Sequence, residues 1–217
     1  MNSFGVVYIH SGGIWEDMQK FSQMTLPKNT PVEIILCDNH IDSLSKRLDL
    51  VNNLPFKNTL YIDVDVIYCS HKFPDWIFNP NLVTGVGMSA WYVANQPWMW
   101  PASWARYFNI DEVKNLPHWF RWPNGGLMFI NKYSKGFFDH WKNIWGEKGL
   151  IEPSFIKAYS KNGKLPFDII DTNFHIPSYA IINDNYKLDN YFFIHAICPP
   201  ESKLEEMSRL FNLLTSK

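Results

Sequence analysis

Two aspartates, Asp63 and Asp65, stand one residue apart in the otherwise apolar stretch LYIDVDVIY. In an extended strand, side chains two positions apart point to the same face, so these carboxyls would lie about 6.6 Å apart along the chain. Ionised carboxylates at that spacing repel each other, and a divalent cation held between them and a phosphate removes the repulsion. Oxygen ligands suit Mg²⁺ or Mn²⁺ better than Zn²⁺.

A simpler interpretation is that Asp63 and Asp65 form the solvated face of a strand whose aliphatic residues face the core. The surrounding elements favour the cation site. The expected order of strand, helix, strand, helix, strand implies a mostly parallel sheet that helices cover on both faces. Sheets of this kind bind ligands at the carboxyl ends of their strands, and the aspartates stand near such an end.

Apolar runs predict the strands, and apolar residues three or four apart predict the helices. The strands that we expect are 4–9, 32–37, 59–68, 82–88, 125–130, 179–182 and 190–195. The helices that we expect start near Ile14, at Asp42 and Ser134 as N-caps, after Pro153, and after Pro200. The tryptophan-rich stretch 89–123 is expected to be irregular, and its rings either stack on sugars or fill a core or an interface.

Other residues could join the aspartates. Lys46 or Arg47, late in the second expected helix, could face a phosphate or a site carboxylate, or simply form a solvated face. The glycines of NGGLMFI allow close approach of the backbone to a ligand, or a tight turn, and Asn124 could offer its amide to a sugar hydroxyl. His195 directly follows an apolar run, where a structural role and a ligand role are both open.

Composition narrows the class of protein. The chain has 217 residues, 46% of them apolar, and a net charge of −1, which predicts one globular domain, or two small ones, with no general attraction to nucleic acid. Three widely spaced cysteines, no signal peptide and no long apolar run predict a cytoplasmic protein without a transmembrane segment. Oligomeric state is left open.

The order and spacing of these motifs resemble the GT-A fold glycosyltransferases, in particular the glycogenin and lipopolysaccharide galactosyltransferase type. The resemblance runs from about Phe4 to Lys203 and rests on LYIDVD, NGGLMFIN, the late His195 and IEPSF at 151–155. It implies a single α/β domain with a GT-A (Rossmann-like) fold, in which helices flank a mixed, mostly parallel central sheet. Residues 1–90 would form the nucleotide-binding half, 91–200 the sugar- and acceptor-binding half, and 201–217 a C-terminal helix.

The resemblance also implies roles for individual residues. Asp63, Asp65 and His195 would hold Mn²⁺ or Mg²⁺ together with the donor's diphosphate, and Arg47 would support the diphosphate or Asp63. The remaining donor contacts that it implies are His10, Ser11 and Asp38 for the nucleotide, Asn124 and Gly125 for the sugar, and Lys203 for phosphate. The sequence after His195 is AICPPESK, whereas the family has H-x-x-G-x-x-K-P-W.

Glu152, in the stretch that is similar to the family's DEPxF helix, would lie near the acceptor. If the reaction inverts the sugar, Glu152 is the first candidate for the general base. The residue before it is Ile151, where the family often has Asp. Asp168 and Asp171 in LPFDIIDTNF are alternative candidates.

The predicted activity is metal-dependent transfer of a sugar from a nucleotide-diphosphate donor, with a UDP-sugar as the first expected donor, to a carbohydrate or glycoconjugate. A sugar-1-phosphate nucleotidyltransferase is one alternative, but such enzymes usually carry a glycine-rich basic loop after the first strand, and HSGGIWEDMQK has no arginine. A non-catalytic carbohydrate-binding or assembly protein is the other alternative. The retained aspartate pair and His195 argue against it.

Overall fold

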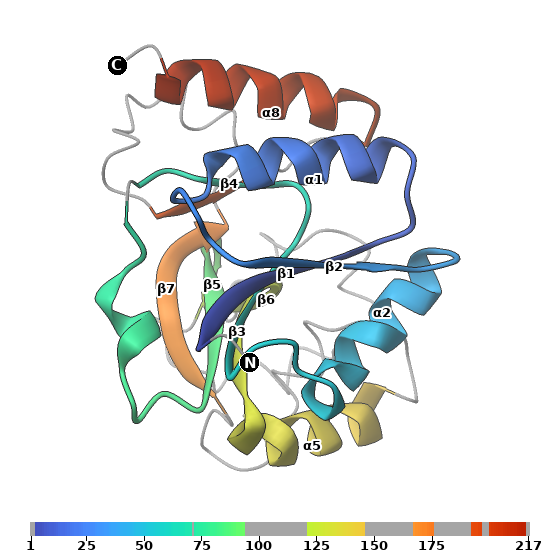
Figure 1. Cartoon of the computed structure of the whole chain (residues 1–217), viewed down its shortest axis with the longest axis vertical. Helices are drawn as coiled ribbons and strands as arrows, with labels where there is room; N and C mark the ends of the chain where they lie inside the picture. The colour runs from blue at the N-terminus through green and yellow to red at the C-terminus, as the bar shows by residue number, and fades with distance from the viewer. Residues whose placement is uncertain are drawn as a thin grey trace.

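The computed structural model describes residues 3–70, 72–93, 121–145, 167–175, 192–196 and 200–215. A six-stranded sheet has the order β2-β1-β3-β6-β5-β7, and a two-stranded sheet pairs β4 with β8 (Figure 1). The strands are β1 (Phe4–His10), β2 (Val32–Leu36), β3 (Asn58–Ile62), β4 (Val66–Tyr68), β5 (Thr84–Val93), β6 (Arg121–Asn131), β7 (Asp168–His175) and β8 (Phe193–His195). The α-helices are α1 (Ile14–Thr25), α2 (His40–Asp49), α5 (Lys135–Trp145) and α8 (Pro200–Thr215), with short 3₁₀ turns at Leu50–Asn52, Asp75–Phe78 and Lys132–Ser134.

The large sheet is mixed and mostly parallel, as predicted. β1 is parallel to both β2 and β3, and β5 is parallel to β7, whereas β6 runs antiparallel to its neighbours β3 and β5. β7 was not among the expected strands. Because β6 is reversed, its first residues lie beside the carboxyl end of β3, and this places the NGG motif next to the aspartate pair.

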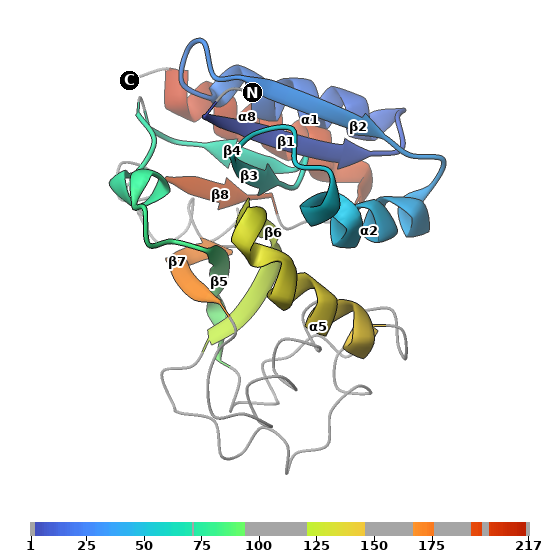
Figure 2. The same ribbon diagram turned by 60° about the horizontal axis from the view of Figure 1, so that its bottom comes forward.

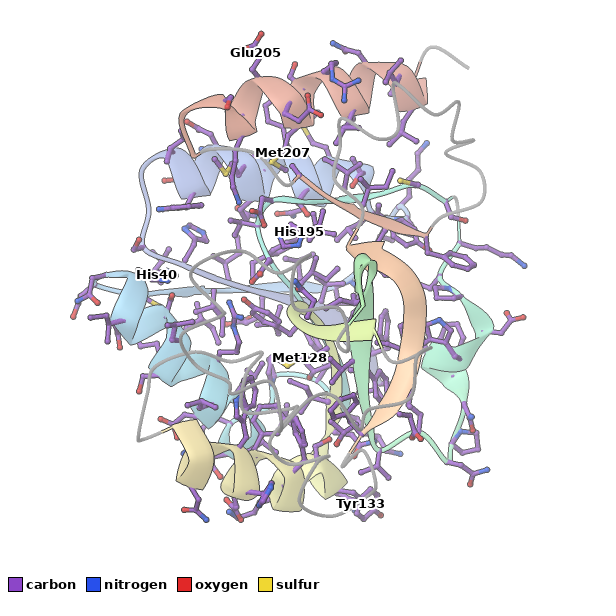
Figure 3. The ribbon with its side chains drawn as sticks, turned by 180° about the vertical axis from the view of Figure 1, so that it is seen from behind. His40, Met128, Tyr133, His195, Glu205 and Met207 are labelled. Atoms are coloured by element: carbon purple, nitrogen blue, oxygen red, sulfur yellow. The ribbon has the colours of Figure 1, made fainter. Side chains whose placement is uncertain are left out.

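Helices cover both faces of this sheet, which explains why the strands are apolar on both sides. In β1, Val7 packs into a core with α2 and α5, while its neighbour Val6 packs into a second core with α1 and α8. Figures 1 and 2 show α1 and α8 side by side on one side of the sheet and α2 and α5 on the other. Met207 of α8, fully buried, belongs to the second core (Figure 3).

The predicted strand 59–68 is wrong in its middle. β3 ends at Ile62, and Asp63 to Asp65 form a turn in which the N–H of Val66 donates to the carbonyl of Asp63 at 3.2 Å. Each side of the turn has its own partner: the N–H of Asp63 donates to Gly126 in the large sheet, and the carbonyl of Asp65 accepts from Ala196 beside β8. The aspartates therefore do not share the face of one strand, because the chain changes sheets between them.

Two expected helix caps also differ. Asn39, not Asp42, is the N-cap of α2, because its extended backbone lets its side chain accept from the N–H of Asp42 at 3.0 Å. Ser134 immediately precedes α5, but its hydroxyl accepts from Asn131, which caps the short 3₁₀ turn leading into the helix. The helix expected after Pro153, the strand 179–182 and residues 94–120 lie outside the described residues.

The C-terminal helix expected after Pro200 is confirmed as α8, with Met207 and Leu210 buried. No described helix is both long enough and apolar enough to span a membrane.

Candidate active site

Asp63 is held at the end of β3 by side chains from two elements. Its Oδ1 accepts from Nη2 of Arg47 at 2.7 Å and from the hydroxyl of Tyr61. Arg47 is only 8% exposed, and its guanidinium carbon lies 4.5 Å from the centre of the Tyr61 ring. Burial raises the pKa of Tyr61 well above its ordinary value, so the phenol stays protonated and donates a hydrogen bond to Asp63. Arg47 therefore contacts a site carboxylate and does not lie on a solvated face, and its contact with a diphosphate stays a prediction.

Asp65 is buried and uses both carboxylate oxygens. Its Oδ1 lies 3.0 Å from Nε2 of His195, and its Oδ2 pairs with Nζ of Lys203. Burial by itself would raise the pKa of the Asp65 carboxyl. Electrostatic interactions and hydrogen bonds with His195 and Lys203 outweigh burial and hold that pKa well below its usual range. Asp65 is therefore ionised at neutral pH.

The turn and β8 together bring three possible metal ligands to one place. One ligand atom from each of Asp63, Asp65 and His195 can be chosen so that all lie within 4.8 Å of one another. His195 is the last residue of β8. Its backbone pairs with that of Val66, the first residue of β4, just after the turn. Two carboxylate oxygens and one imidazole nitrogen form a donor set that fits Mn²⁺ or Mg²⁺.

The NGG motif is built around Asp63. The N–H of Gly126 donates to Oδ1 of the buried Asn124 at 2.7 Å. A Cβ atom at Gly126 would lie 2.6 Å from Oδ2 of Asp63, so a side chain there would collide with the carboxyl. The carbonyl of Gly125 accepts from Nη1 of Arg47 at 3.5 Å. Asn124 and Gly125, expected to contact the sugar, thus lie beside the aspartates.

A cavity of about 260 Å³ opens beside the turn, and most of the residues predicted for the site line it. Figure 3 labels His40 of α2 and His195 of β8, which both border the cavity. The lining residues are Ile9, His10, Ser11, Trp15, His40, Ser43, Arg47, Asp63, Val64, Asp65, His195 and Lys203. Asp38 is not among them and lies exposed before α2.

Sequence reasoning missed Trp15, His40 and Ser43. The only signal that could have found them is their place directly after the first two strands, since the loops at the carboxyl ends of parallel strands meet at one edge. Ser43 and His40 lie on the first turns of α2, and Trp15 lies on the first turn of α1.

His10 is a hydrogen-bond donor without a partner among the described residues. It is 4% exposed, and its Nδ1 accepts from the N–H of Gly12 at 3.1 Å, which leaves the ring proton on Nε2. Nε2 is buried, and nothing in the described part of the chain accepts from it. Burial lowers the pKa of His10 and so keeps the imidazole neutral. The negative charge of Glu16 opposes this shift only in part. Gly12 and Gly13 have φ of 79° and 61°, which lets the loop turn back over the ring.

The candidates for a general base lie elsewhere. Asp171 of β7 is paired with Gly87 of β5, and Gly87 is paired with Asn124 of β6, so these three residues stand level across the sheet. Asp168 is exposed and pairs with Gly85, so it lies further along the sheet from Asn124 than Asp171 does. Glu152, and with it Trp98, Trp100, Trp104 and Trp119, lie outside the described residues.

No family model matches this sequence, and no curated protein does either. Solved structures do match. A glycosyltransferase involved in the glycosylation of the major capsid of PBCV-1 has a TM-score of 0.58 and 10% identity, covering 95% of this chain and 99% of that one. The galactosyltransferase LgtC, solved with donor and acceptor sugar analogs, has a TM-score of 0.56 and 10% identity, covering 97% and 95%. The bifunctional WbbM has a TM-score of 0.55 and 10% identity, covering 100% and 52%.

At identities this low, the structural matches show a shared fold and nothing beyond the fold. The chain has the GT-A type fold of these glycosyltransferases, as the motif resemblance implied.

Proposed function

We propose that this chain is a glycosyltransferase that moves a sugar from a nucleotide-diphosphate donor, a UDP-sugar first, to a carbohydrate or glycoconjugate acceptor with Mn²⁺ or Mg²⁺. The observation that carries the proposal is the gathering of Asp63, Asp65 and His195 within 4.8 Å at one end of β3. The same three residues line a cavity that also reaches β1 and α2. The shared fold supports the same activity.

The cavity offers the donor two kinds of surroundings. Near β1, the cavity is lined by His10, whose buried Nε2–H has no acceptor among the described residues, and by Trp15, on whose ring a flat base can stack. Near the turn, the aspartates, His195 and Lys203 suit a diphosphate that arrives with a cation. A divalent cation bound there would neutralise part of the charge that grows on the departing nucleoside diphosphate.

The aspartates need fixed positions for this work. Arg47 and Tyr61 hold the Asp63 carboxyl, and Gly126 leaves room for it. Such a preorganised arrangement avoids reorganisation when the reaction's charge develops.

We assign residues 1–90 to the nucleotide and 91–200 to the sugar and acceptor. Asp171 stands level with Asn124 two strands away, about 10 Å at the usual strand spacing. This supports Asp171 over Asp168 as a base for an inverting reaction, beside Glu152, which the motif resemblance favours.

The test is thermal unfolding of the purified protein with a panel of nucleotide-diphosphate sugars, with and without Mn²⁺, followed by detection of released nucleotide and transferred sugar. Ligand at a hundredfold excess over its Kd stabilises the folded state by about 2.7 kcal/mol, or a Tm rise of about 5–10 °C for a chain of this size. Asp65→Ala should abolish the shift, while Asp75→Ala, at an exposed position, should keep it.

A donor that binds but is never consumed, with any acceptor tried, would favour the non-catalytic carbohydrate-binding protein. No shift with any donor under any metal condition would refute the proposal.

A further inference from the structure

Lys203 is paired with the carboxylate of Asp65, which a divalent cation at this site would need as a ligand. It lies 138 residues after Asp65 in sequence, on the first turn of α8, and its ammonium pairs with Oδ2 of Asp65. Both side chains are largely buried, with 16% and 7% of their surface exposed. His195 takes the other oxygen. A cation that approaches Asp65 therefore meets a carboxylate that is already neutralised.

The two aspartates have separate basic partners. Arg47 balances Asp63, and Lys203 balances Asp65, so the site compensates its own charges. Without such compensation, a buried carboxylate is strongly destabilising. The two partners differ in freedom. Arg47 is packed on the Tyr61 ring and bonded to Gly125, whereas a lysine ammonium is a point charge on a flexible stem.

We propose that Lys203 is an internal counterion of Asp65 that leaves this carboxylate when a divalent cation binds, so that the phosphate contact which the motif resemblance implies for Lys203 becomes available only with the cation. The proposal rests on the proposed function and adds to it a coupling between the two ligands. Binding of the cation alone would leave the Lys203 ammonium without a carboxylate partner. Binding of the diphosphate alone would draw Lys203 away and leave the Asp65 carboxylate without its ammonium. Together they give every charge a partner.

Cation and donor should consequently bind cooperatively through Lys203. Such coupling is reciprocal and commonly amounts to about 5–150-fold in affinity. Direct contact between cation and diphosphate adds to the coupling with or without Lys203, so the contribution of Lys203 is the difference between the protein and a variant that lacks the ammonium.

The experiment is calorimetric titration of Mn²⁺ into the protein, without nucleotide and with saturating UDP as the probe. Lys203→Met keeps most of the stem and removes the charge. We expect it to bind Mn²⁺ alone at least fivefold more tightly than the wild type, and to gain at least fivefold less affinity from UDP. Lys142→Met removes a lysine from an exposed ion pair with Asp49 and should match the wild type. Lys203→Arg keeps the charge and should retain the coupling.

Unchanged or weaker Mn²⁺ affinity in Lys203→Met would overturn the inference while leaving the proposed function standing. If neither the wild type nor any variant binds Mn²⁺ or UDP, the proposed function itself fails. A wild-type measurement covers the case in which Lys203→Met does not fold. The rate of amine acylation at Lys203, followed by mass spectrometry, should rise with Mn²⁺ alone and fall when UDP is added. A rate that Mn²⁺ leaves unchanged would equally overturn the inference.

Discussion

Gly126 lies so close to Asp63 that a Cβ atom there would be 2.6 Å from Oδ2 of the carboxyl and 2.8 Å from Oδ1 of Asn124. The Asp63 carboxyl cannot retreat without breaking its bonds to Arg47 and Tyr61. The glycine that sequence reasoning linked to a ligand or a turn is thus required by an aspartate of the same site.

Gly126→Ala should therefore displace Asp63. We expect a loss of about 1–3 kcal/mol in the free energy of unfolding, the usual result of overpacking, and at least tenfold weaker Mn²⁺ binding. Urea unfolding and calorimetry measure the two effects. Gly136→Ala is the matched control, because open space surrounds that helical glycine, and it should stabilise slightly. Equal behaviour of the two variants would contradict the close fit.

Arg47→Met should destabilise the protein even without ligands, because it leaves the Asp63 carboxylate without its cation. Breaking a buried pair costs about 3–5 kcal/mol, and the partial exposure of Asp63 lowers our expectation to about 2–3 kcal/mol in urea unfolding. Lys142→Met, at an exposed pair, should lose about 1 kcal/mol or less. If Arg47→Met matches this control, Arg47 does not hold Asp63 in solution.

Asp65 should make the stability of the metal-free protein depend on pH. Its folded pKa lies below the unfolded value near 3.9, so its contribution is present above that pH and is lost as pH falls through the folded pKa. The wild type should exceed Asp65→Asn in free energy of unfolding near pH 7, and the gap should narrow below about pH 4. Urea unfolding at pH 7, 5, 4 and 3 measures the gap. A gap that stays constant down to pH 3 would show that the pairing in the structure does not lower this pKa.

His10 should titrate below the ordinary histidine value of 6.5. Its burial opposes the charged ring, and a proton on Nδ1 would face the N–H of Gly12. Because the unfolded chain accepts the proton more readily, stability should fall as pH drops below about 6.5. NMR titration of the ring C–H signal, assigned by its absence in His10→Gln, gives the pKa. A midpoint at or above 6.5 would contradict a buried neutral ring.

Asp171→Asn should lower turnover by about 10²–10⁴-fold if the transfer inverts the anomeric carbon and Asp171 is the base. Asp168→Asn, on the same strand but exposed, should change turnover little. Steady-state transfer assays with the donor found above measure both. Donor and Mn²⁺ affinities should stay unchanged in Asp171→Asn. If Glu152→Gln causes the loss instead, Glu152 is the base.

Hydrophobic patterning predicted β1, β2, α1 and α8 well, because burying an apolar run or stripe is a local requirement that each segment carries in its own residues. β7 escaped prediction, since DIIDTNFH mixes polar and apolar residues without clear alternation. The strand at 59–68 was predicted as continuous because its apolar residues continue past Asp65, although the chain changes partners there.

The sequence by itself determined which residue types belong to the site and in what order: Asp63 and Asp65 next to a strand end, the NGG motif, and His195 after β8. Only the tertiary structure decided how they are used. It pairs Arg47 with Asp63 and Lys203 with Asp65, and it packs the Asp63 carboxyl against Gly126, where a side chain would not fit. Local propensities act over a few residues, whereas these pairings join segments far apart in sequence, and charge compensation in a buried site is settled only when those segments meet.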